Sequence, residues 1–273
     1  MLTLGLDVGG STTKAAAISE DGTITAVLQV TASDQLTSLY GALGRFLYEN
    51  NLKLADISRI VLTGVGASFI DSDIYGIPTI RVKEFEAIGK GGLMLSGLDR
   101  ALVVSMGTGT AFVNACGSEF RHIGGSGIGG GTLLGLSSKI LHENNIEAVL
   151  KYAESGDLAN VDLSIADICQ DEISNLPPTA TAANFGKVRS TANKSDFALG
   201  LINAVIQNTG VLASFACLNS ECKTAVAVGS LACLPQTKEI LDGVGALNGV
   251  KFIIPDKAIF ATALGAAALA DTK

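Results

Sequence analysis

The segment Leu2–Lys14, LTLGLDVGGSTTK, dictates the organisation of the rest of the chain. Alternating leucines predict a short strand that ends at Asp7, and Gly9–Gly10 permit a tight reversal into a second strand, Ala15–Ile18. Backbone N–H groups in such a turn point into a concavity where an anion can sit. Three hydroxyl groups at Ser11–Thr13 add donors, so the segment predicts a phosphate-binding hairpin.

A carboxylate stands at the end of the first predicted strand, beside the glycine turn. Asp7 in this position is suited to hold a hydrated Mg²⁺ ion, because Mg²⁺ prefers oxygen ligands and accompanies phosphate. The alternative is an ordinary hairpin with a glycine turn. The order Asp-x-Gly-Gly-Ser-x-x-Lys directly after an apolar strand favours phosphate binding.

The composition predicts a folded protein with a large core. The chain has 273 residues, of which 48% are hydrophobic and 16% charged, and its mean hydropathy is +0.42. That length suits two medium domains or one large domain. No apolar run is expected to be long and uninterrupted enough to span a bilayer, which needs about 20 residues, so we expect no membrane partner. We expect part of the apolar surplus in a subunit interface.

Charge and cysteine usage indicate which partners and which cellular compartment to expect. The formal net charge is −7 and no basic cluster stands out, which argues against nucleic acid as a partner. The first residues lack a basic stretch followed by an apolar segment, so we expect a cytoplasmic protein. Five scattered cysteines in apolar surroundings are expected to be reduced thiols rather than a disulfide framework.

A second strand–turn–strand pattern begins near residue 100. The apolar strand Ala101–Met106 leads through Gly107–Thr110, GTGT, into the strand Ala111–Ala115. Two such hairpins indicate a duplicated domain, in which two phosphate turns face each other across a cleft. The predicted lobes cover residues 1–99 and 100–273.

The densest glycine segment is Arg121–Leu136, RHIGGSGIGGGTLLGL. It leads into a helical apolar pattern over Thr132–Leu141, and a glycine loop that feeds a helix N-terminus is a good anion site. The alternative, a flexible linker, would not normally carry Ile123 and Ile128 between the glycines. We therefore interpret the segment as a ligand-binding loop.

Three predicted helices stand out in the pattern. One covers Gln35–Glu49, with Ser33 or Asp34 as its N-cap. A second, Glu84–Leu95, contains three glycines, which weaken a helix, so we expect close approach of a ligand or another backbone there. A third, Asp196–Leu218, carries apolar residues on more than one face, which is typical of a helix buried between domains or subunits.

Six motifs occur along most of the chain, and their order carries a family resemblance. They are DVGGSTTK at Asp7–Lys14, KEFEA at Lys83–Ala87, GTGT at Gly107–Thr110, GGSGIGGGTLLGL at Gly124–Leu136, TAANFG at Thr181–Gly186 and VGS at Val228–Ser230. The ordered set resembles the type II pantothenate kinases of the acetate kinase/sugar kinase/Hsp70/actin superfamily.

This resemblance implies a two-lobed α/β fold of duplicated RNase H-like units, the actin-like ATPase fold, with ATP in the cleft and a homodimer. It implies an ATP-dependent kinase that phosphorylates the primary hydroxyl of pantothenate, the first step of coenzyme A synthesis. Asp7 would help to position Mg²⁺. The implied nucleotide contacts are Asp7, Gly9, Gly10, Ser11, Thr12, Thr13, Lys14, Gly107, Thr108, Gly109, Gly129, Gly130, Gly131, Thr132, Gly229 and Ser230.

The catalytic base implied by position in the KEFEA motif is Glu84. Phosphoryl transfer to an alcohol needs a carboxylate that orients the hydroxyl and accepts its proton. Glu86 is the rival carboxylate. For either residue the plain alternative is a solvated acid in the first turn of a helix, where the helix dipole favours negative charge.

The acceptor side departs from the family pattern. Where the family has an arginine before the apolar-Gly-Gly step, this chain has His122, with Arg121 one place earlier. A histidine cannot reproduce the two-pronged contact of arginine with a carboxylate, and neighbouring strand residues face opposite ways unless the strand is bulged or short. A related hydroxy acid or amide is therefore an alternative acceptor. The candidate acceptor-binding residues are Arg121, His122, Thr110 and Asn184.

Two further functions compete with the kinase. One is an ATP-driven activator of acyl-CoA dehydratases, which needs cysteine ligands for a cluster at the dimer interface. Cys217 and Cys222 are the candidate ligands, but their spacing matches no strong iron–sulfur pattern. The other is a catalytically silent nucleotide-binding regulator, against which the presence of Asp7 and Glu84 argues.

Overall fold

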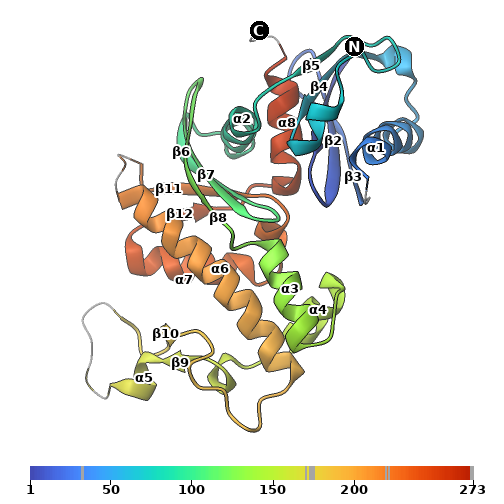
Figure 1. Ribbon diagram of the computed structural model, residues 1–273. Coiled ribbons are helices and arrows are strands. Elements are labelled where there is room, and N and C mark those ends of the chain that lie inside the picture. Colours follow the sequence, from blue (N-terminus) through green and yellow to red (C-terminus); the bar gives the residue numbers. More distant parts are fainter. Residues whose placement is uncertain (32–33, 170, 172–175, 219, 221, 271–273) are drawn as a thin grey trace.

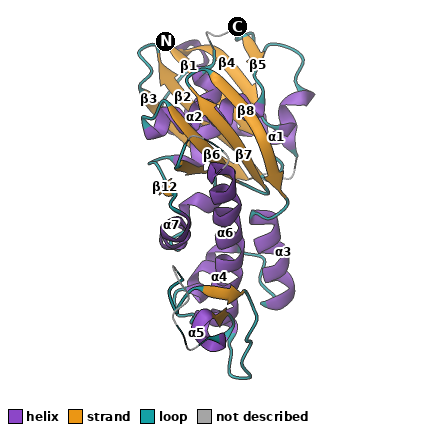
Figure 2. Ribbon diagram, turned by 90° about the vertical axis from the view of Figure 1, so that its left-hand side faces the viewer, coloured by secondary structure: helices purple, strands orange, loops and turns teal. Residues whose placement is uncertain are grey.

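Two lobes make up the molecule, each built around a five-stranded sheet (Figure 1). The computed structural model describes residues 1–31, 34–169, 171, 176–218, 220 and 222–270. Two helices lie between the sheets, and a long helix extends from the second sheet to a small outlying unit (Figure 2).

The N-terminal sheet has the strand order β3-β2-β1-β4-β5. Its first three strands form an antiparallel meander, and the other two run parallel to β1. The strands are β1 (Leu2–Val8), β2 (Thr12–Ser19), β3 (Ile24–Thr31), β4 (Ile57–Thr63) and β5 (Thr79–Arg81). Helix α1 (Gln35–Glu49) packs on this sheet, and the Asp34 carboxylate caps it by accepting a hydrogen bond from the Thr37 amide at 2.6 Å. The alternative cap, Ser33, lies outside the described residues.

The C-terminal sheet repeats the same topology in the order β12-β11-β6-β7-β8. Again three sequential strands form a meander, and two parallel strands join its first strand. The strands are β6 (Arg100–Met106), β7 (Thr110–Cys116), β8 (Glu119–Ser126), β11 (Thr224–Val228) and β12 (Lys251–Ile253). The predicted duplicated α/β fold is therefore confirmed by topology.

The predicted glycine loop is corrected in its first half. Residues 121–126 belong to strand β8, which pairs with β7, so the loop is limited to Gly127–Gly129 before helix α3 (Gly130–Ile140). Glycine weakens an isolated strand, but pairing along a neighbouring strand overrides that local tendency.

The remaining elements of the C-terminal lobe surround the long helix α6 (Lys194–Leu218). Buried residues of α6 share a core with the Leu102 and Phe112 face of the sheet. The other helices are α4 (Ile146–Ala153), α5 (Ile165–Ile168) and α7 (Thr237–Asn248), and a two-stranded sheet joins β9 (Leu163–Ser164) to β10 (Thr181–Ala183). The 3₁₀ helices of both lobes are η1 (Leu54–Asp56), η2 (Val65–Phe69), η3 (Leu158–Asn160), η4 (Leu231–Cys233) and η5 (Ala258–Phe260).

Helix α6 corrects the expectation that no apolar run reaches membrane-spanning length. By length and composition it is the one helix in the described part of the chain that could cross a membrane. However, 56% of its apolar window is buried inside the protein, and it packs against α3, α4 and α7. Its apolar character is explained by burial in the core of the C-terminal lobe, and the expected burial between domains or subunits stays a prediction.

Helices α2 (Glu84–Ser96) and α8 (Ala261–Ala268) lie side by side between the two sheets (Figure 1). A Cβ atom on Gly91 would overlap the Ala261 carbonyl, and one on Gly265 would overlap the Ala87 carbonyl. Gly91 of α2 therefore allows close approach of another backbone, one of the two expected alternatives, whereas Gly89 and Gly92 face the side chains of Phe120 and Val103. Helix α8 also packs on β1 and β2, so the end of the chain returns to the N-terminal lobe, and the boundary at residue 99 stays a prediction.

Candidate active site

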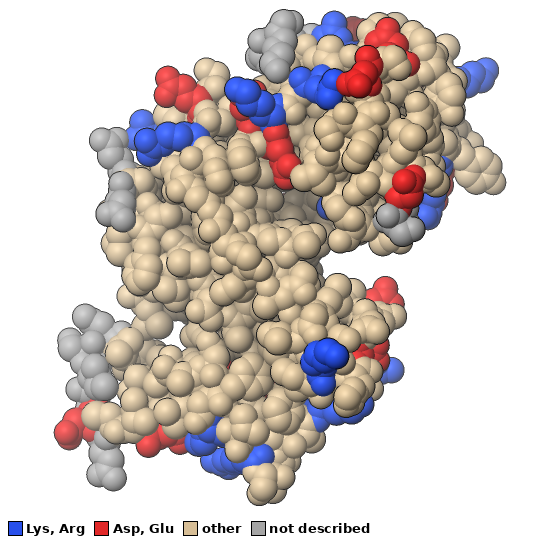
Figure 3. Space-filling model, in the orientation of Figure 1, with Lys and Arg blue, Asp and Glu red and all other residues tan. Residues whose placement is uncertain are grey.

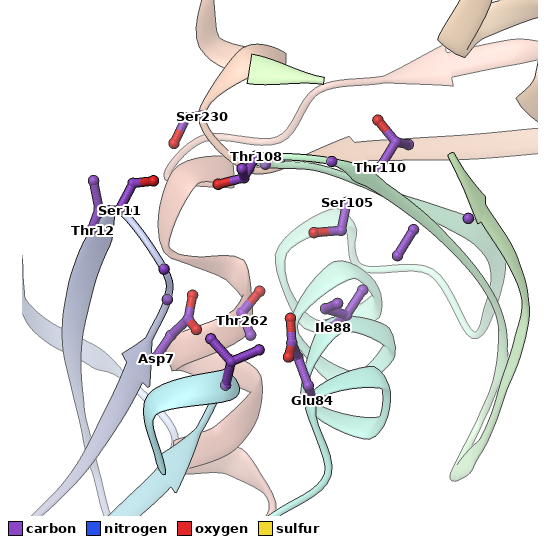
Figure 4. Close-up of a pocket in the computed structure, with 18 of the residues that line it drawn as sticks. Asp7, Ser11, Thr12, Glu84, Ile88, Ser105, Thr108, Thr110, Ser230 and Thr262 are labelled. Carbon is purple, nitrogen blue, oxygen red and sulfur yellow. The ribbon is translucent and has the colours of Figure 1, made fainter. Parts of the chain in front are cut away.

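A cavity of about 570 Å³ lies between the lobes, where strands β1 and β6 end. Figure 3 shows the surface hollowed between the N-terminal lobe and the part of the C-terminal lobe that contains α3 and α4. Both predicted turns, Asp7 and Glu84 line this one cavity. Figure 4 shows the Asp7 and Glu84 carboxylates directed into the same space, with Thr108 on its opposite side.

The first turn connects β1 and β2. The Gly9 amide donates to the Thr12 carbonyl at 3.1 Å, which closes the reversal. The amides of Gly10 and Ser11 are exposed and have no acceptor among the described residues. Two unpaired N–H groups of this kind make an anion-binding concavity.

The residues after the turn divide between the two faces of β2. Lys14 lines the cavity, and its ammonium donates to the Thr12 hydroxyl at 2.8 Å. Thr13 points the other way, is buried, and shares a hydrogen bond of 2.6 Å with the Ser38 hydroxyl of α1. Alternation along the strand therefore keeps Thr13 away from the cavity, and its predicted phosphate contact stays a prediction.

Asp7 is held at the end of β1 by close packing. A Cβ atom on Gly64, which has φ +87°, would lie 2.7 Å from Asp7 Oδ1. Burial raises the pKa of Asp7 to about 6, the Lys14 ammonium opposes that rise, and the Glu84 charge adds to it. Lys14 Nζ lies 3.9 Å from Asp7 Oδ2. The carboxylate therefore sits where a cation would stabilise its charged form.

The second turn connects β6 and β7 and mirrors the first. The Gly107 amide donates to the Gly109 carbonyl at 2.9 Å. The amides of Thr108 and Gly109 are exposed and, within the described ranges, lack an acceptor. Thr110 lines the cavity, but its hydroxyl already donates a hydrogen bond within the protein, to the Ile128 carbonyl at 2.9 Å.

The start of α3 supports this second turn. The Gly130 amide donates to the Gly107 carbonyl at 2.8 Å, and the Gly131 amide donates to the Thr108 carbonyl at 2.9 Å. A Cβ atom on Gly129 would lie 2.5 Å from the Thr108 carbonyl oxygen. Gly129, Gly130, Gly131 and Thr132 do not line the cavity, so their nucleotide contacts stay predictions. The amides of Gly130 and Gly131 orient the turn, so this helix N-terminus is used within the protein.

Gly229 and Ser230 follow β11 and line the cavity, as the VGS motif implied. Gly229 has φ +92°, and a Cβ atom there would lie 2.7 Å from the Met106 carbonyl oxygen. This contact places the end of β11 against the end of β6. Sequence analysis assigned no role to several further lining residues, namely Val65, Ile88, Ser105, Ala111, Ile259 and Thr262. Phe85 lies in the KEFEA motif, and Gly125 and Ser126 lie in the segment that was interpreted as a ligand-binding loop. Ser105 also had a sequence signal, because it lies near the end of an apolar strand, two residues before the GTGT turn.

Glu84 begins α2 and its carboxylate reaches the cavity (Figure 4). Burial raises the pKa of Glu84 above its ordinary value of 4.5, and the Lys14 charge opposes that rise. The rival, Glu86, forms an ion pair with Lys83 at 3.1 Å and does not line the cavity. The geometry therefore favours Glu84 as the carboxylate that can meet a reactant.

His122 and Arg121 lie on opposite faces of β8. The His122 ring lines the cavity and stacks on Phe85, with ring centroids 3.8 Å apart and planes 4° apart. Arg121 lines a different cavity of about 330 Å³, with Arg100 and Cys116. Strand β8 does contain a bulge at Ile123, but it follows both residues and does not bring Arg121 to the catalytic side.

Asn184 follows β10, lies beside α6 and does not line the cavity. Its side-chain amide donates to Gln207 at 2.9 Å and accepts from Asn208 at 3.2 Å. It also lies 3.4 Å from the buried Asp162 carboxylate. Neither Asn184 nor Arg121 lines the catalytic cavity, so their predicted acceptor contacts stay predictions.

Comparison with known proteins places the chain among relatives of one family. The profile of the Fumble family matches residues 100–241. A protein of Staphylococcus haemolyticus named type II pantothenate kinase is 29% identical, and the alignment covers 96% of this chain and 98% of that protein.

Solved structures show the fold. The activator of the 2-hydroxyisocaproyl-CoA dehydratase from Clostridium difficile, with bound ADPNP, has a TM-score of 0.71 at 18% identity, with 98% of this chain and 93% of that chain covered. A ROK family glucokinase from Streptomyces griseus, in complex with glucose and AMPPNP, has a TM-score of 0.64 at 12% identity and covers both chains fully. These neighbours confirm the predicted two-lobed actin-like ATPase fold, and the chain belongs to the Fumble family.

Proposed function

We propose that this protein is a Mg²⁺-dependent kinase that transfers the terminal phosphoryl group of ATP to the primary hydroxyl of pantothenate. The observation that carries the proposal is one cavity in which two turns, whose amide N–H groups lack an acceptor in the described part of the chain, face two carboxylates. The Staphylococcus haemolyticus relative, aligned along almost the whole chain, supports pantothenate as the acceptor and coenzyme A synthesis as the context.

The two turns would hold the phosphate chain from opposite sides. The amides of Gly10 and Ser11 on one lobe, and of Thr108 and Gly109 on the other, have no acceptor among the described residues and would donate to phosphate oxygens. The Lys14 ammonium on the same wall adds positive charge. Oriented donors that are already in place stabilise developing negative charge without reorganisation during the reaction. Gly229 and Ser230 would then lie near the adenosine.

Asp7 fits the role of a Mg²⁺ ligand. Mg²⁺ in phosphoryl-transfer sites keeps several waters and binds one or two carboxylates together with substrate phosphates. The described residues contain no cluster of three or more His, Cys, Asp and Glu, so any metal there would depend on this mode of binding. When bound, Mg²⁺ supplies charge neutralisation on the phosphates, and Asp7 would fix its position.

Glu84 would act as the general base. Its carboxylate faces the cavity from the start of α2, where it can accept a hydrogen bond from the acceptor hydroxyl and then its proton. A raised pKa makes the ionised carboxylate a stronger base at neutral pH. Lys14 would keep enough of it ionised.

The acceptor would lie between Glu84 and the stacked rings of Phe85 and His122. This wall offers a flat apolar surface and an imidazole rather than a guanidinium, because Arg121 faces the other side of β8. A neutral or singly hydrogen-bonded acceptor end therefore fits as well as a carboxylate. A related hydroxy acid or amide is the alternative acceptor within the same proposal.

The cysteines support a kinase over a cluster-bearing activator. Cys217 is fully buried in the core of the C-terminal lobe. A cluster shared between two subunits needs cysteine ligands at the subunit surface. The structural likeness to a dehydratase activator extends to the fold, which both functions share.

We also propose a cytoplasmic homodimer. Leu212, Phe215 and Leu218 on α6 are 39%, 53% and 53% exposed, and a second copy of the chain could cover them. Sedimentation equilibrium of the purified protein tests this point. A monomer at micromolar concentration would contradict it.

The proposal is tested by ATP consumption with a panel of acceptors: pantothenate, pantoate, pantetheine and simple sugars. We expect turnover with pantothenate or its amide derivatives, and none with sugars. A His122→Arg variant serves as the matched comparison and should shift preference toward the free carboxylate. Absence of acceptor-dependent ADP release with every member of the panel would contradict the kinase.

A further inference from the structure

A buried hydroxyl group without a partner lies at the end of β4. Thr63 is buried, and its hydroxyl oxygen has no hydrogen-bond partner among the described residues. Leaving a buried polar group unpaired costs free energy, so each such group in a native protein requires an explanation. The other buried threonines of the described chain each form a side-chain hydrogen bond, namely Thr13, Thr110, Thr209 and Thr237.

The N-terminal sheet places Thr63 beside Asp7. Strands β1 and β4 run parallel, and their register pairs Asp7 directly with Thr63. Neighbouring strands lie about 4.8 Å apart, and side chains two residues apart on a strand point to the same face. Gly5, two residues before Asp7, lies against α8, and Val61, two residues before Thr63, packs with residues of α2 and α8. Asp7 and Thr63 therefore both point to the face of the sheet that these helices cover.

The Asp7 carboxylate is the matching acceptor. Asp7 is buried and, within the described ranges, accepts no hydrogen bond, since Lys14 Nζ is 3.9 Å from its Oδ2. The residue after Thr63 packs on the same carboxylate, because a Cβ atom on Gly64 would lie 2.7 Å from Asp7 Oδ1. A buried hydroxyl that lacks an acceptor and a buried carboxylate that lacks a donor thus lie side by side.

We propose that Thr63 is a positioning residue, whose hydroxyl donates a hydrogen bond to the Asp7 carboxylate when Mg²⁺ and nucleotide are bound. This inference rests on the proposed function, in which Asp7 holds the metal. Carboxylates that bind a metal are themselves hydrogen-bonded by neighbouring groups, which fix their orientation. Hydrogen bonds of an active site are often long in the protein alone and tighten in the complex with substrates. Thr63 does not line the cavity, so it acts through Asp7 and not on the reactants.

Nucleotide binding with and without Mg²⁺ tests the proposal apart from catalysis. The Kd of ADPNP is measured by isothermal titration calorimetry in Mg²⁺ and in EDTA, and the ratio of the two values gives the gain in affinity from Mg²⁺. Thr63→Val keeps the shape of the side chain but removes the hydroxyl, and it should reduce this gain about tenfold or more. The affinity in EDTA should stay native. Thr63→Ser retains the hydroxyl and should retain the gain.

Ser137→Ala is the matched control. Ser137 lies on α3, is fully buried and does not line the cavity, and its hydroxyl likewise has no partner in the described part of the chain. Loss of this hydroxyl should leave the gain from Mg²⁺ native. If Thr63→Val fails to fold, Thr63→Ala is compared with Thr63→Ser, because these two variants differ only in the hydroxyl.

The outcomes separate this inference from the proposed function. A native gain from Mg²⁺ in Thr63→Val, an equal loss of gain in Ser137→Ala, or a loss of affinity of the same size in EDTA would each overturn the role of Thr63 alone. If the unaltered chain binds no ADPNP, or gains no affinity from Mg²⁺, the proposed Mg²⁺-dependent kinase is contradicted, and the role of Thr63 is overturned with it.

Discussion

The two turns of the catalytic cavity share one backbone design but differ in charge. Each is a hairpin reversal at the end of a central strand, and each presents two exposed amides that lack an acceptor among the described residues. Among the described residues that line the cavity, the charged side chains of Asp7 and Lys14 lie beside the first turn, with Glu84 close by. The duplicated fold thus provides two anion-binding turns. The groups that can move protons or hold a metal lie on the side of the cavity that carries the first turn.

The supports of the two turns differ as well. The first is fixed by side-chain packing, with Gly64 against Asp7 and a buried hydrogen bond between Thr13 and Ser38. The second is fixed by backbone, through the amides of Gly130 and Gly131. Changes to the charged residues beside the first turn should therefore alter chemistry, and changes to the backbone support of the second turn should alter nucleotide affinity.

Glu84→Gln should have the largest effect. Loss of the general base should lower kcat by about 10²- to 10⁴-fold, while ATP affinity stays unchanged, because the phosphate cradle is untouched. Steady-state kinetics with isothermal titration of ADPNP measures both quantities. Glu86→Gln is the matched control, since Glu86 is paired with Lys83 outside the cavity, and it should keep native turnover. Native kcat in Glu84→Gln would remove Glu84 from the mechanism.

Asp7→Asn should change the Mg²⁺ dependence of the reaction. The amide is a weaker Mg²⁺ ligand, so we expect activity to fall about 10- to 100-fold and the Mg²⁺ concentration for half-maximal activity to rise. Rates measured across a Mg²⁺ titration at fixed ATP test this expectation. An unchanged dependence of the rate on Mg²⁺ concentration would show that the Asp7 carboxylate does not bind the metal.

The same substitution should stabilise the protein in the absence of metal and nucleotide. Burial raises the pKa of Asp7 from 3.8 to about 6, so its folded form binds a proton more readily than its unfolded form. The free energy of unfolding therefore falls as pH rises from about 4 to 6, by about 3 kcal/mol in total. Urea unfolding in EDTA should show Asp7→Asn more stable than native at pH 8 and nearly equal at pH 4.

Asp21→Asn provides the control of opposite sign for this stability prediction. Hydrogen bonds to Ser19 and Thr23 lower the pKa of the exposed Asp21 carboxyl. The ionised Asp21 carboxylate therefore stabilises the folded protein at pH values above the ordinary pKa of the group. This contribution is lost on acidification. Asp21→Asn should therefore be no more stable than native at pH 8. A gain at pH 8 in both variants would show that burial of Asp7 is not the cause.

Gly129→Ala tests the backbone support of the second turn. Its Cβ would lie 2.5 Å from the Thr108 carbonyl oxygen, so the turn must shift. A loss of one or two kcal/mol would raise the Kd for ATP roughly 5- to 30-fold, with kcat for bound substrate little changed. Gly127→Ala is the matched control, because its Cβ would meet no atom within 4 Å. Equal affinities in the two variants would contradict the support role of α3.

Ser38→Ala should have the smallest effect. It leaves the buried Thr13 hydroxyl without its partner at 2.6 Å, which should lower the free energy of unfolding by about 1 kcal/mol. Activity at saturating substrate should stay near native, because Thr13 does not line the cavity. Thermal unfolding and kcat measured on one preparation check both parts. A large loss of kcat at native stability would place Thr13 in the reaction.

Local patterns predicted the elements that carry the chemistry. The bounds of α1 match the predicted range Gln35–Glu49, and both glycine turns were found from strand–turn–strand patterns. Helix α7 was not predicted, since Gly243 and Gly245 lower its helix propensity and packing against α6 stabilises it instead.

Relations between distant segments could not be obtained from local pattern. Nothing in the sequence near Thr262 indicates that α8 returns to the N-terminal sheet and places this residue in the cavity. The amides of Gly130 and Gly131 read locally as a free helix N-terminus, and only the folded chain shows that the second turn uses them. Strand alternation predicted that Arg121 and His122 face opposite ways unless the strand is bulged. Only the structure shows that the bulge, at Ile123, follows both residues and leaves them on opposite faces of β8.

The most direct test of the account is a crystal structure of the protein with Mg²⁺ and ADPNP. The account predicts phosphate oxygens within hydrogen-bond distance of the amides of both Gly10 and Thr108, the metal on the Asp7 side, and Glu84 facing the terminal phosphate. Phosphates bound outside the cavity, or held by one turn alone, would contradict it.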